Sequence, residues 1–368
     1  MALINSEAVL AALNSVKDPD LNKDIISLDF VRDIKVEDTN VSLKLVSPNP
    51  SPAAKANLEK AVREALREFS ILGDVQIAIE NDIPNGRGAS GKQAIPGVKN
   101  IIAVSSGKGG VGKSTVAVNL AVALAQWGAK VGLVDTDVYG PNVPIMIGID
   151  QDPLVQGQKL LPLEAYNVKV MSIGFLNRGD RPVIWRGPML GTAVRQFLYD
   201  VIWGELDYLI VDMPPGTGDV QLSLAQMVPV QGAVLVTTPQ EVAMADVRKA
   251  INMFEQVHIP VFGIVENMSY FICPNCSEKH SIFGSGGGAE LAGKFKTKLL
   301  GQIPLSTGVR EGGDAGLPII IGAPESVQAA AIREIATNVA AQVSRAAFVE
   351  AGLPVINMGD GRGDSFTV

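Results

Sequence analysis

A glycine-rich segment at residues 107–115 has the residue types and spacing of a phosphate-binding loop. Its sequence, GKGGVGKST, matches the pattern G-x-x-x-x-G-K-[ST]. Glycines allow backbone N–H groups to turn toward phosphate oxygens, and the N-terminus of a following helix adds a favourable dipole. Lys113 is expected to reach the β- and γ-phosphates, and Ser114 to supply a hydroxyl ligand to Mg²⁺. The predicted nucleotide-binding residues of the loop are Gly107, Lys108, Gly109, Gly110, Val111, Gly112, Lys113, Ser114 and Thr115.

Three aspartates follow two strongly apolar runs downstream of this loop. Asp135 and Asp137 come at the end of the run at 131–134, and Asp212 ends the run at 208–211. An acid at the end of a strand near a phosphate-binding loop suits coordination of Mg²⁺ through water. We assign this role to Asp212 and expect Asp137 to position the attacking water. Asp135 could do either, or brace the loop.

Cys273 and Cys276 form a C-x-x-C turn and are the only cysteines of the chain. Two thiolates at this spacing can share one metal ion or cluster, but the pattern alone also fits half of a zinc site, a redox pair or a coincidence. His280 could add a zinc ligand, although a single histidine seldom indicates one. A cubane iron–sulfur cluster takes four thiolates, so a symmetric dimer would complete such a site across its two-fold axis.

The order of elements from residue 99 to 368 predicts the scaffold that positions these groups. Short apolar runs alternate with helical stretches, which is typical of a doubly wound α/β fold with a mostly parallel sheet and ligands at the carboxyl ends of the strands. One such run, 101–104, directly precedes the glycine-rich segment, and a helical stretch, 115–127, follows it. This context disfavours the alternative of an ordinary glycine-rich turn.

Residues 1–83 have a different order, with helix, two strands, helix and strand in sequence. Leu58, Val62, Leu66 and Phe69 fall on one face of the second helical stretch. The pattern predicts a small α+β domain with its own core. The polar, glycine-rich stretch at 84–98 is predicted to be a flexible linker between this domain and the one at 99–368.

Composition excludes several classes of protein. The chain has 31 Lys and Arg against 38 Asp and Glu, and its formal net charge is −7. This balance argues against a general nucleic-acid binder, because bulk charge would not neutralise a phosphate backbone. The first residues lack the basic region of a signal peptide, and we find no uncharged apolar run long enough to span a bilayer. We therefore expect a cytoplasmic protein with no membrane or nucleic-acid partner.

A second lysine in the phosphate-binding loop, Lys108, gives the sequence a resemblance to a known group. The pattern K-G-G-x-G-K-[ST] is the deviant Walker A loop, and the sequence resembles the nucleotide-switch ATPases that include MinD, ParA and the nitrogenase iron protein. In that group the extra lysine reaches the nucleotide of a partner subunit. The resemblance implies a homodimer, with Lys108, Lys113 and Asp137 as the catalytic residues.

Four further motifs narrow the resemblance to the Mrp/ApbC family of iron–sulfur cluster carrier ATPases. They lie at residues 135–142, 185–189, 212–219 and 265–269. The resemblance implies that Asn267 reads the adenine ring. We also expect Pro304 and Arg310 to border the base. It also implies that Cys273 and Cys276 hold a labile [4Fe–4S] cluster shared between subunits. The N-terminal module resembles the MIP18-type domain that often precedes such ATPases.

The sequence thus predicts a slow, Mg²⁺-dependent ATPase that carries a [4Fe–4S] cluster from an assembly scaffold to apo iron–sulfur proteins. Two alternatives are a spatial-regulator ATPase of the MinD or ParA type and a nucleotide-gated electron-transfer protein. A spatial regulator needs a basic amphipathic tail or a basic face, and the tail at 352–364 is neither amphipathic nor strongly basic. The nitrogenase iron protein spaces its ligand cysteines far apart, whereas a tight C-x-x-C suits a labile cluster.

Overall fold

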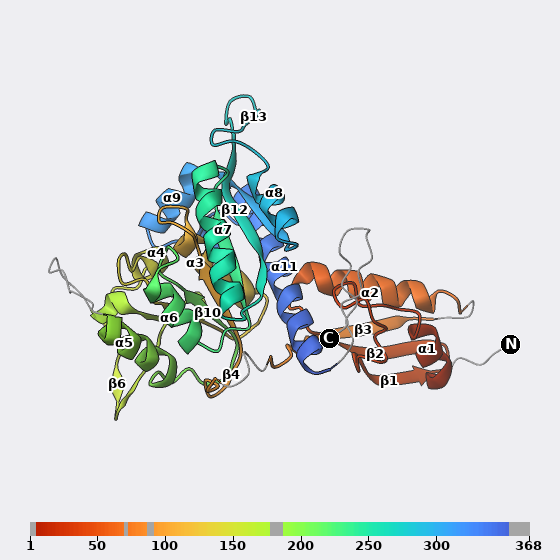
Figure 1. Cartoon of the computed structure of the whole chain (residues 1–368). Coiled ribbons are helices and arrows are strands. Elements are labelled where there is room, and N and C mark those ends of the chain that lie inside the picture. The colour runs from red at the N-terminus through yellow and green to blue at the C-terminus, as the bar shows by residue number, and fades with distance from the viewer. Residues whose placement is uncertain (1–4, 70–72, 87–91, 177–186, 353–368) are drawn as a thin grey trace. The chain divides into compact units, whose positions relative to one another are not determined.

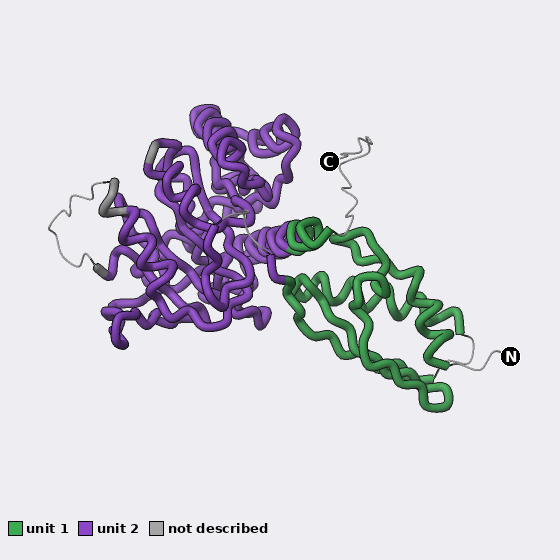
Figure 2. The backbone as a smooth tube through the Cα atoms, turned by 60° about the horizontal axis from the view of Figure 1, so that its bottom comes forward, with its two compact units in different colours: residues 1–84, 344–368 green, residues 85–343 purple. Residues whose placement is uncertain are grey.

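The computed structural model describes residues 5–69, 73–86, 92–176 and 187–352 of the chain. The chain divides into two compact units, one made of residues 1–84 and 344–368 and one made of residues 85–343 (Figure 2). Within the described ranges, no helix combines the length and the apolar character that crossing a membrane requires.

The first unit is a three-stranded sheet with two helices (Figure 1). Strand β1 pairs antiparallel with β2, and β2 pairs parallel with β3. Ser51 caps the second helix by accepting a hydrogen bond from the backbone N–H of Ala54, and Pro52 occupies the first turn, where its missing N–H is not needed. The predicted small α+β module is confirmed, with elements α1 (Ser6–Leu13), β1 (Val31–Glu37), β2 (Asn40–Ser47), α2 (Pro52–Leu66) and β3 (Val75–Asn81).

The last turns of the C-terminal helix α11 (Val327–Glu350) group with the first unit. The ring of Phe348 packs edge-on against Phe30, with ring centroids 6.0 Å apart. Nearby, the Ser344 hydroxyl donates to the carbonyl of Pro48 at 3.1 Å, and Arg345 Nε donates to the carbonyl of Asp20. Ser344, Arg345 and Phe348 thus pack on the first unit, although the sequence alone groups them with residues 99–343.

The second unit is built on a nine-stranded sheet in the order β13-β12-β11-β4-β10-β5-β9-β8, with β14 also paired to β12. Pairing is parallel except at β8 and β13, so the predicted doubly wound α/β fold is confirmed. The strands of this sheet are β4 (Val98–Ser105), β5 (Val131–Asp135), β8 (Leu163–Ala165), β9 (Val168–Ser172), β10 (Leu206–Asp212), β11 (Gly232–Thr237), β12 (Val261–Ile272), β13 (Lys279–His280) and β14 (Leu299–Leu305).

Helices cover both faces of this sheet. The crossover from β4 to β5 runs one way along the sheet and that from β11 to β12 runs the other way. Because parallel crossovers are right-handed, their helices α3 and α7 lie on opposite faces (Figure 1). The remaining elements of the unit, besides the short hairpin β6 (Val155–Gln156) and β7 (Lys159–Leu160), are α3 (Lys113–Gln126), α4 (Val143–Ile147), α5 (Gly187–Tyr199), α6 (Asp219–Met227), α7 (Glu241–Gln256), α8 (Gly287–Lys294), α9 (Thr307–Asp314) and α10 (Ile319–Gly322).

The segment predicted to be a flexible linker is packed where the structure describes it. Lys92 Nζ donates to the carbonyls of Ala225 at 2.7 Å and Val228 at 2.9 Å. The Tyr199 hydroxyl donates to the carbonyl of Gln93 at 2.7 Å. These hydrogen bonds hold the end of the segment against the second unit, because the carbonyls at the end of α6 offer acceptors to the lysine.

Candidate functional site

The phosphate-binding loop connects β4, which lies in the centre of the sheet, to the helix α3. Gly112 is the N-cap of α3 and has φ of 85°, a left-handed conformation that favours glycine. A Cβ added at Gly112 would lie 2.2 Å from Asn267 Nδ2, so a side chain there would also displace Asn267. The loop therefore ends in an uncapped helix N-terminus, whose free N–H groups suit an anion.

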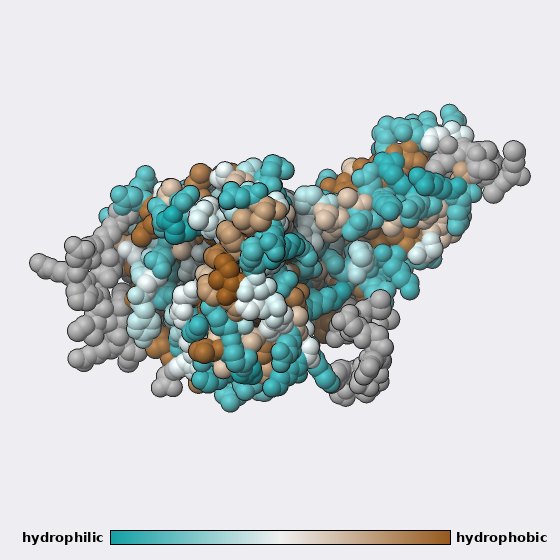
Figure 3. Space-filling view, turned by 90° about the horizontal axis from the view of Figure 1, so that it is seen from above, coloured by the Kyte–Doolittle hydropathy of each residue, from teal (hydrophilic) through white to brown (hydrophobic). Residues whose placement is uncertain are grey.

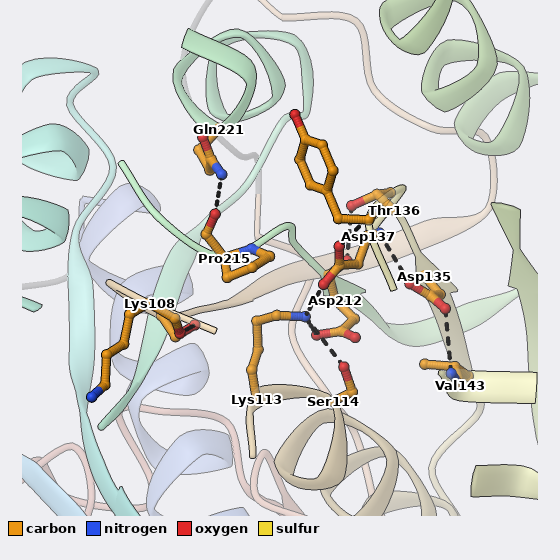
Figure 4. Close-up of polar contacts among 12 residues, drawn as sticks. Lys108, Lys113, Ser114, Asp135, Thr136, Asp137, Val143, Asp212, Pro215 and Gln221 are labelled. Atoms are coloured by element: carbon orange, nitrogen blue, oxygen red, sulfur yellow. Dashed lines mark hydrogen bonds and ion pairs between the residues drawn. The ribbon is translucent and has the colours of Figure 1, made fainter. Parts of the chain in front are cut away.

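Lys113 lies at the centre of a buried cluster of charges (Figure 4). Its Nζ is 2.6 Å from Asp212 Oδ1, 3.4 Å from Asp137 Oδ2 and 3.3 Å from Ser114 Oγ. Burial alone would lower the pKa of Lys113, but the carboxylates of Asp212 and Asp137 outweigh burial and raise the pKa. The ammonium is therefore a fixed positive charge at the base of the loop.

Asp212 and Asp135 lie side by side because they are paired residues of the neighbouring strands β10 and β5. Burial raises the pKa of Asp212, partly offset by Lys113. Asp212 Oδ2 is buried and has no hydrogen-bond donor among the described residues. Two carboxylates, those of Asp137 and Asp212, thus pair with one lysine, and the carboxyl group of Asp135 lies beside them. This excess of buried negative charge fits a divalent cation bound beside Ser114.

Asp135 braces the loop that carries Asp137. It accepts hydrogen bonds from the backbone N–H of Asp137 at 3.0 Å and of Val143 at 3.3 Å, and from Ser172 Oγ at 2.9 Å. Burial, reinforced by the charge of Asp212, raises the pKa of Asp135 to about 7. The sequence left several roles open for Asp135, and its contacts in the structure support the bracing role.

Lys108 lies apart from this cluster. Its side chain points away from Lys113 and Asp212 (Figure 4), and the structure describes no ion pair for it. Its backbone carbonyl accepts a hydrogen bond from Ser106 Oγ at 2.8 Å. Within one chain, therefore, Lys108 does not reach the groups around Lys113.

A cavity of about 310 Å³ opens beside the loop. Asn267 lies in its wall and donates from Nδ2 to the carbonyl of Val111 at 2.9 Å. Pro304 and Arg310 also line the cavity, as the sequence predicts for the surroundings of the base. Asn142 and Met268, which belong to the motifs at 135–142 and 265–269, also line the cavity. Sequence reasoning missed other wall residues, which come from α4 and α9 and carry no local motif: Ile145, Met146, Val309 and Gly313.

The two cysteines lie at the tip of a hairpin formed by β12 and β13, which projects from the second unit (Figure 1). Cys273 is half-buried and Cys276 is exposed, and both are free thiols. The backbone N–H groups of Cys276 and Asn275 hydrogen-bond to the Cys273 sulfur and lower the pKa of its thiol. The turn therefore favours a thiolate, the form that binds metals. Two other motif residues, Trp185 and Arg186, lie outside the described residues.

Comparison with known proteins relates both units to iron–sulfur proteins. Residues 97–340 match the family model of NUBPL iron-transfer P-loop NTPases of the ParA type, and residues 6–79 match that of an iron–sulfur cluster assembly protein. An iron–sulfur cluster carrier protein of Synechocystis sp. is 48% identical over 353 residues, covering 94% of this chain and 100% of that protein. The corresponding carrier of Escherichia coli is 44% identical, covering 91% of each.

The chain belongs to the family of iron-transfer P-loop NTPases.

Solved structures agree with this assignment. The nucleotide-binding protein of Archaeoglobus fulgidus in complex with ADP is 44% identical, with a TM-score of 0.55, and the match covers 60% of this chain and 88% of that one. The cell division ATPase MinD of Pyrococcus furiosus is 25% identical, with a TM-score of 0.50, over 65% of this chain and 98% of that one. In this iron-transfer NTPase the phosphate-binding loop leads from β4 of a mostly parallel sheet into helix α3.

Proposed function

We propose that this protein binds and slowly hydrolyses ATP and carries a [4Fe–4S] cluster, which it receives from an assembly scaffold and delivers to apo iron–sulfur proteins in the cytoplasm. The observation that carries the ATPase half is the buried cluster of Lys113, Asp137 and Asp212 beneath a phosphate-binding loop. The carrier half is supported by the exposed pair of free cysteines and by the names of the relatives.

Binding of ATP would rearrange the charges around Lys113. The phosphates offer a larger negative charge than the carboxylates, so Lys113 would leave Asp212 and Asp137 for the β- and γ-phosphates. Ser114 Oγ and, through water, the freed oxygens of Asp212 would then hold Mg²⁺, which supplies positive charge to the phosphates. Asn267 and the cavity beside it would hold the base.

Hydrolysis would transfer the γ-phosphoryl group to water. The water oxygen bonds to the γ-phosphorus as the bond to the β–γ bridging oxygen breaks, which yields ADP and phosphate. Asp137 accepts a hydrogen bond from the attacking water and orients it. Lys113, together with Lys108 of a partner subunit, stabilises the charge that develops on the phosphoryl oxygens. The orientation of Lys108 away from its own Lys113 is consistent with action in a partner.

The cluster would lie between two copies of the chain. One chain supplies two thiols, whereas a four-iron cubane cluster is held by about four thiolate ligands. A homodimer would therefore complete the ligand set. Tyr139, Ile145, Val242 and Ile282 each expose more than half of their surface. The second unit also shows a small hydrophobic area within a mostly hydrophilic face (Figure 3).

Anaerobic reconstitution with iron and sulfide tests the carrier half. Wild-type protein is expected to hold about four irons per dimer, with the Mössbauer spectrum of a [4Fe–4S] cluster, and to pass it to an apoprotein acceptor. Cys273→Ala and Cys276→Ala should each lose the cluster, since the remaining pair of thiols cannot close a cubane. A single variant that still holds and transfers a full cluster would exclude the turn as the carrier site.

A further inference from the structure

Glu266 is a buried carboxylate in the motif at 265–269, and the nucleotide chemistry gives it no role. It lies in β12 next to Asn267 of the cavity wall, and its surface is fully buried. Its Oε2 accepts a hydrogen bond from the backbone N–H of Gly288 at 2.6 Å, and its Oε1 accepts one from Gln302 Nε2 at 2.7 Å. These hydrogen bonds offset the cost of burying the carboxylate. Glu266 therefore joins three elements, β12, β14 and the first turn of α8.

The N-terminus of α8 depends on Glu266 for its cap. Gly286 is the N-cap residue of this helix and, as a glycine, offers no side chain to the free N–H groups of the first turn. The carboxylate of Glu266 takes that place from the neighbouring strand, and its charge suits the positive end of the helix dipole. The two elements are in close contact, because a Cβ added at Gly288 would lie 3.0 Å from Glu266 Oε2. Glu266 thus sets where α8 begins on β12.

The residue beside Glu266 connects the same strand to the phosphate-binding loop. Neighbouring residues of a strand point to opposite faces of a sheet, so β12 presents Glu266 to α8 and Asn267 toward the loop. Asn267 Nδ2 donates to the carbonyl of Val111 at 2.9 Å, and Asn267 also lines the cavity beside the loop. Two consecutive residues of β12 therefore link the nucleotide site to the start of α8.

Helix α7 connects the loop to α8 a second time. A Cβ added at Gly107 would overlap the backbone of Asp246 in α7, and one added at Gly287 would overlap the sulfur of Met244 in the same helix. At both places the absence of a side chain permits the close approach. The first two turns of α7 thus contact the phosphate-binding loop on one side and α8 on the other.

The cysteine hairpin, which is the β12–β13 hairpin at residues 268–280, returns into α8. The chain runs from His280 through residues 281–286 to the first turn of the helix. The outgoing side of the hairpin is irregular directly after Asn267. Met268 has φ of 55°, a left-handed conformation, and the register of β12 against β14 shifts between Asn267 and Phe271. Because such an irregularity bends a strand, the position of the turn depends on α8 as well as on β12.

We propose that Glu266 is a positioning residue that couples the nucleotide site to the cysteine hairpin by holding α8 to the strand of Asn267. A nucleotide in the cavity restrains Asn267 and the loop. Glu266 and α7 pass this restraint to α8 and to the returning side of the hairpin. Coupling between two sites typically changes affinities by about 5–150-fold. The inference rests on the nucleotide half of the proposed function and not on the cluster, since it concerns the cluster-free protein.

Hydrogen exchange of the reduced, cluster-free, full-length protein with and without Mg-ADP tests this coupling. We expect ADP to slow exchange at 287–291 in α8 and at 273–277 in the turn, each by at least about fivefold in the wild type. Glu266→Met keeps the size of the side chain but accepts no hydrogen bond. It should reduce both effects to less than about twofold, while calorimetry still detects ADP binding. Glu266→Gln should retain both effects, because its amide oxygen still accepts from Gly288.

Glu290→Met is the matched control, since it makes the same change at an exposed carboxylate of the same helix. It should respond to ADP as the wild type does. Gly288→Ala is a second test should Glu266→Met fold poorly, because its Cβ displaces α8 from Glu266 and should also reduce the response.

Full protection by ADP in folded Glu266→Met or in Gly288→Ala would overturn the coupling role, as would an equal loss of protection in Glu290→Met. Wild-type protein that binds ADP without protection of α8 would remove this inference and leave the proposed function standing. Failure of the wild type to bind ADP would remove both.

Discussion

The nucleotide loop and the cysteine hairpin hold their functional groups in opposite ways. Lys113, Asp137 and Asp212 are buried and ion-paired at the carboxyl ends of parallel strands in the centre of the sheet. Cys276, Glu278 and His280 are exposed, on a hairpin whose returning strand is only two residues long. The core of the unit positions the first group, whereas under the proposed function a bound cluster and a second subunit would order the second.

This difference predicts which properties a substitution at each site should change. Buried charges depend on one another, so removal of one leaves the others unpaired in a poorly solvated site. Exposed side chains exchange their partners for water at little cost. Substitutions at the loop should therefore change activity and stability together, while substitutions at the hairpin should change only what the hairpin binds.

The largest effect is expected from Lys113→Ala. Removing a cation that stabilises the transferring phosphoryl group should slow ATP hydrolysis by at least about a hundredfold. Loss of the buried pair with Asp212 should also lower the free energy of unfolding, on the order of 3 kcal/mol. Steady-state phosphate release and denaturant unfolding measure the two effects.

Lys159→Ala is the matched control, since Lys159 pairs with Asp200 at 3.0 Å but both side chains are about half exposed. It should change the free energy of unfolding by less than about 1 kcal/mol. Equal effects of the two lysine variants would contradict the contrast between buried and exposed groups.

Asp137→Asn should separate binding from chemistry within the loop. The amide keeps the size of the side chain, but it holds the attacking water less strongly than a carboxylate does. We expect ATP binding, measured by calorimetry, to persist while hydrolysis slows by about a hundredfold. Loss of binding together with turnover would show that Asp137 holds the metal or the loop instead.

Asp18 tests whether a buried carboxylate also affects stability where no ion pair accompanies it. Burial raises the pKa of Asp18 to about 6, although it accepts hydrogen bonds from the backbone N–H groups of Leu21 and Asp20 and lies near Arg345. The folded first unit thus binds the proton more tightly than the unfolded chain. Its stability should fall by up to about 3 kcal/mol as the pH rises from 4 through 6.

Asp18→Asn should remove this dependence and stabilise the first unit near pH 7, because an amide keeps both hydrogen bonds without a charge. Hydrogen exchange of the β2 amides reports on this unit alone. Asp24→Asn is the control: Asp24 is only partly buried, and its pKa is lowered by the backbone N–H and hydroxyl of Ser27. A wild-type pH profile that Asp18→Asn leaves unchanged would contradict the assignment.

The smallest effect on the nucleotide site is expected from Cys276→Ala. Its side chain is exposed, so the free energy of unfolding should change by less than about 0.5 kcal/mol. ATP hydrolysis by the metal-free protein should change by less than about twofold. Ser281→Ala, just beyond the hairpin, serves as the reference. A loss of hydrolysis as large as that of Lys113→Ala would indicate that the nucleotide loop and the cysteine hairpin act as one site.

Local patterns explain which features the sequence could predict. The glycine spacing around Lys113 and the apolar runs before Asp135 and Asp212 are contained in a few consecutive residues, and parallel strands bring their ends to one edge. The bracing of Asp135 by Ser172 was not predictable, because the two residues meet only through the pairing of β5 with β9. The packing of Phe348 on Phe30 likewise joins the two ends of the chain and leaves no local signal.

The length of β12 constrains how this chain can vary. Asn267 in the cavity wall lies in β12, and Cys273 follows the last residue of that strand, six residues further along the chain. Deleting one residue between them would turn every later side chain to the opposite face, whereas deleting two would restore the face and only shorten the reach. Changes in length that keep the thiols in place should therefore involve an even number of residues, which the iron content of reconstituted one-residue and two-residue deletions within 269–271 can establish.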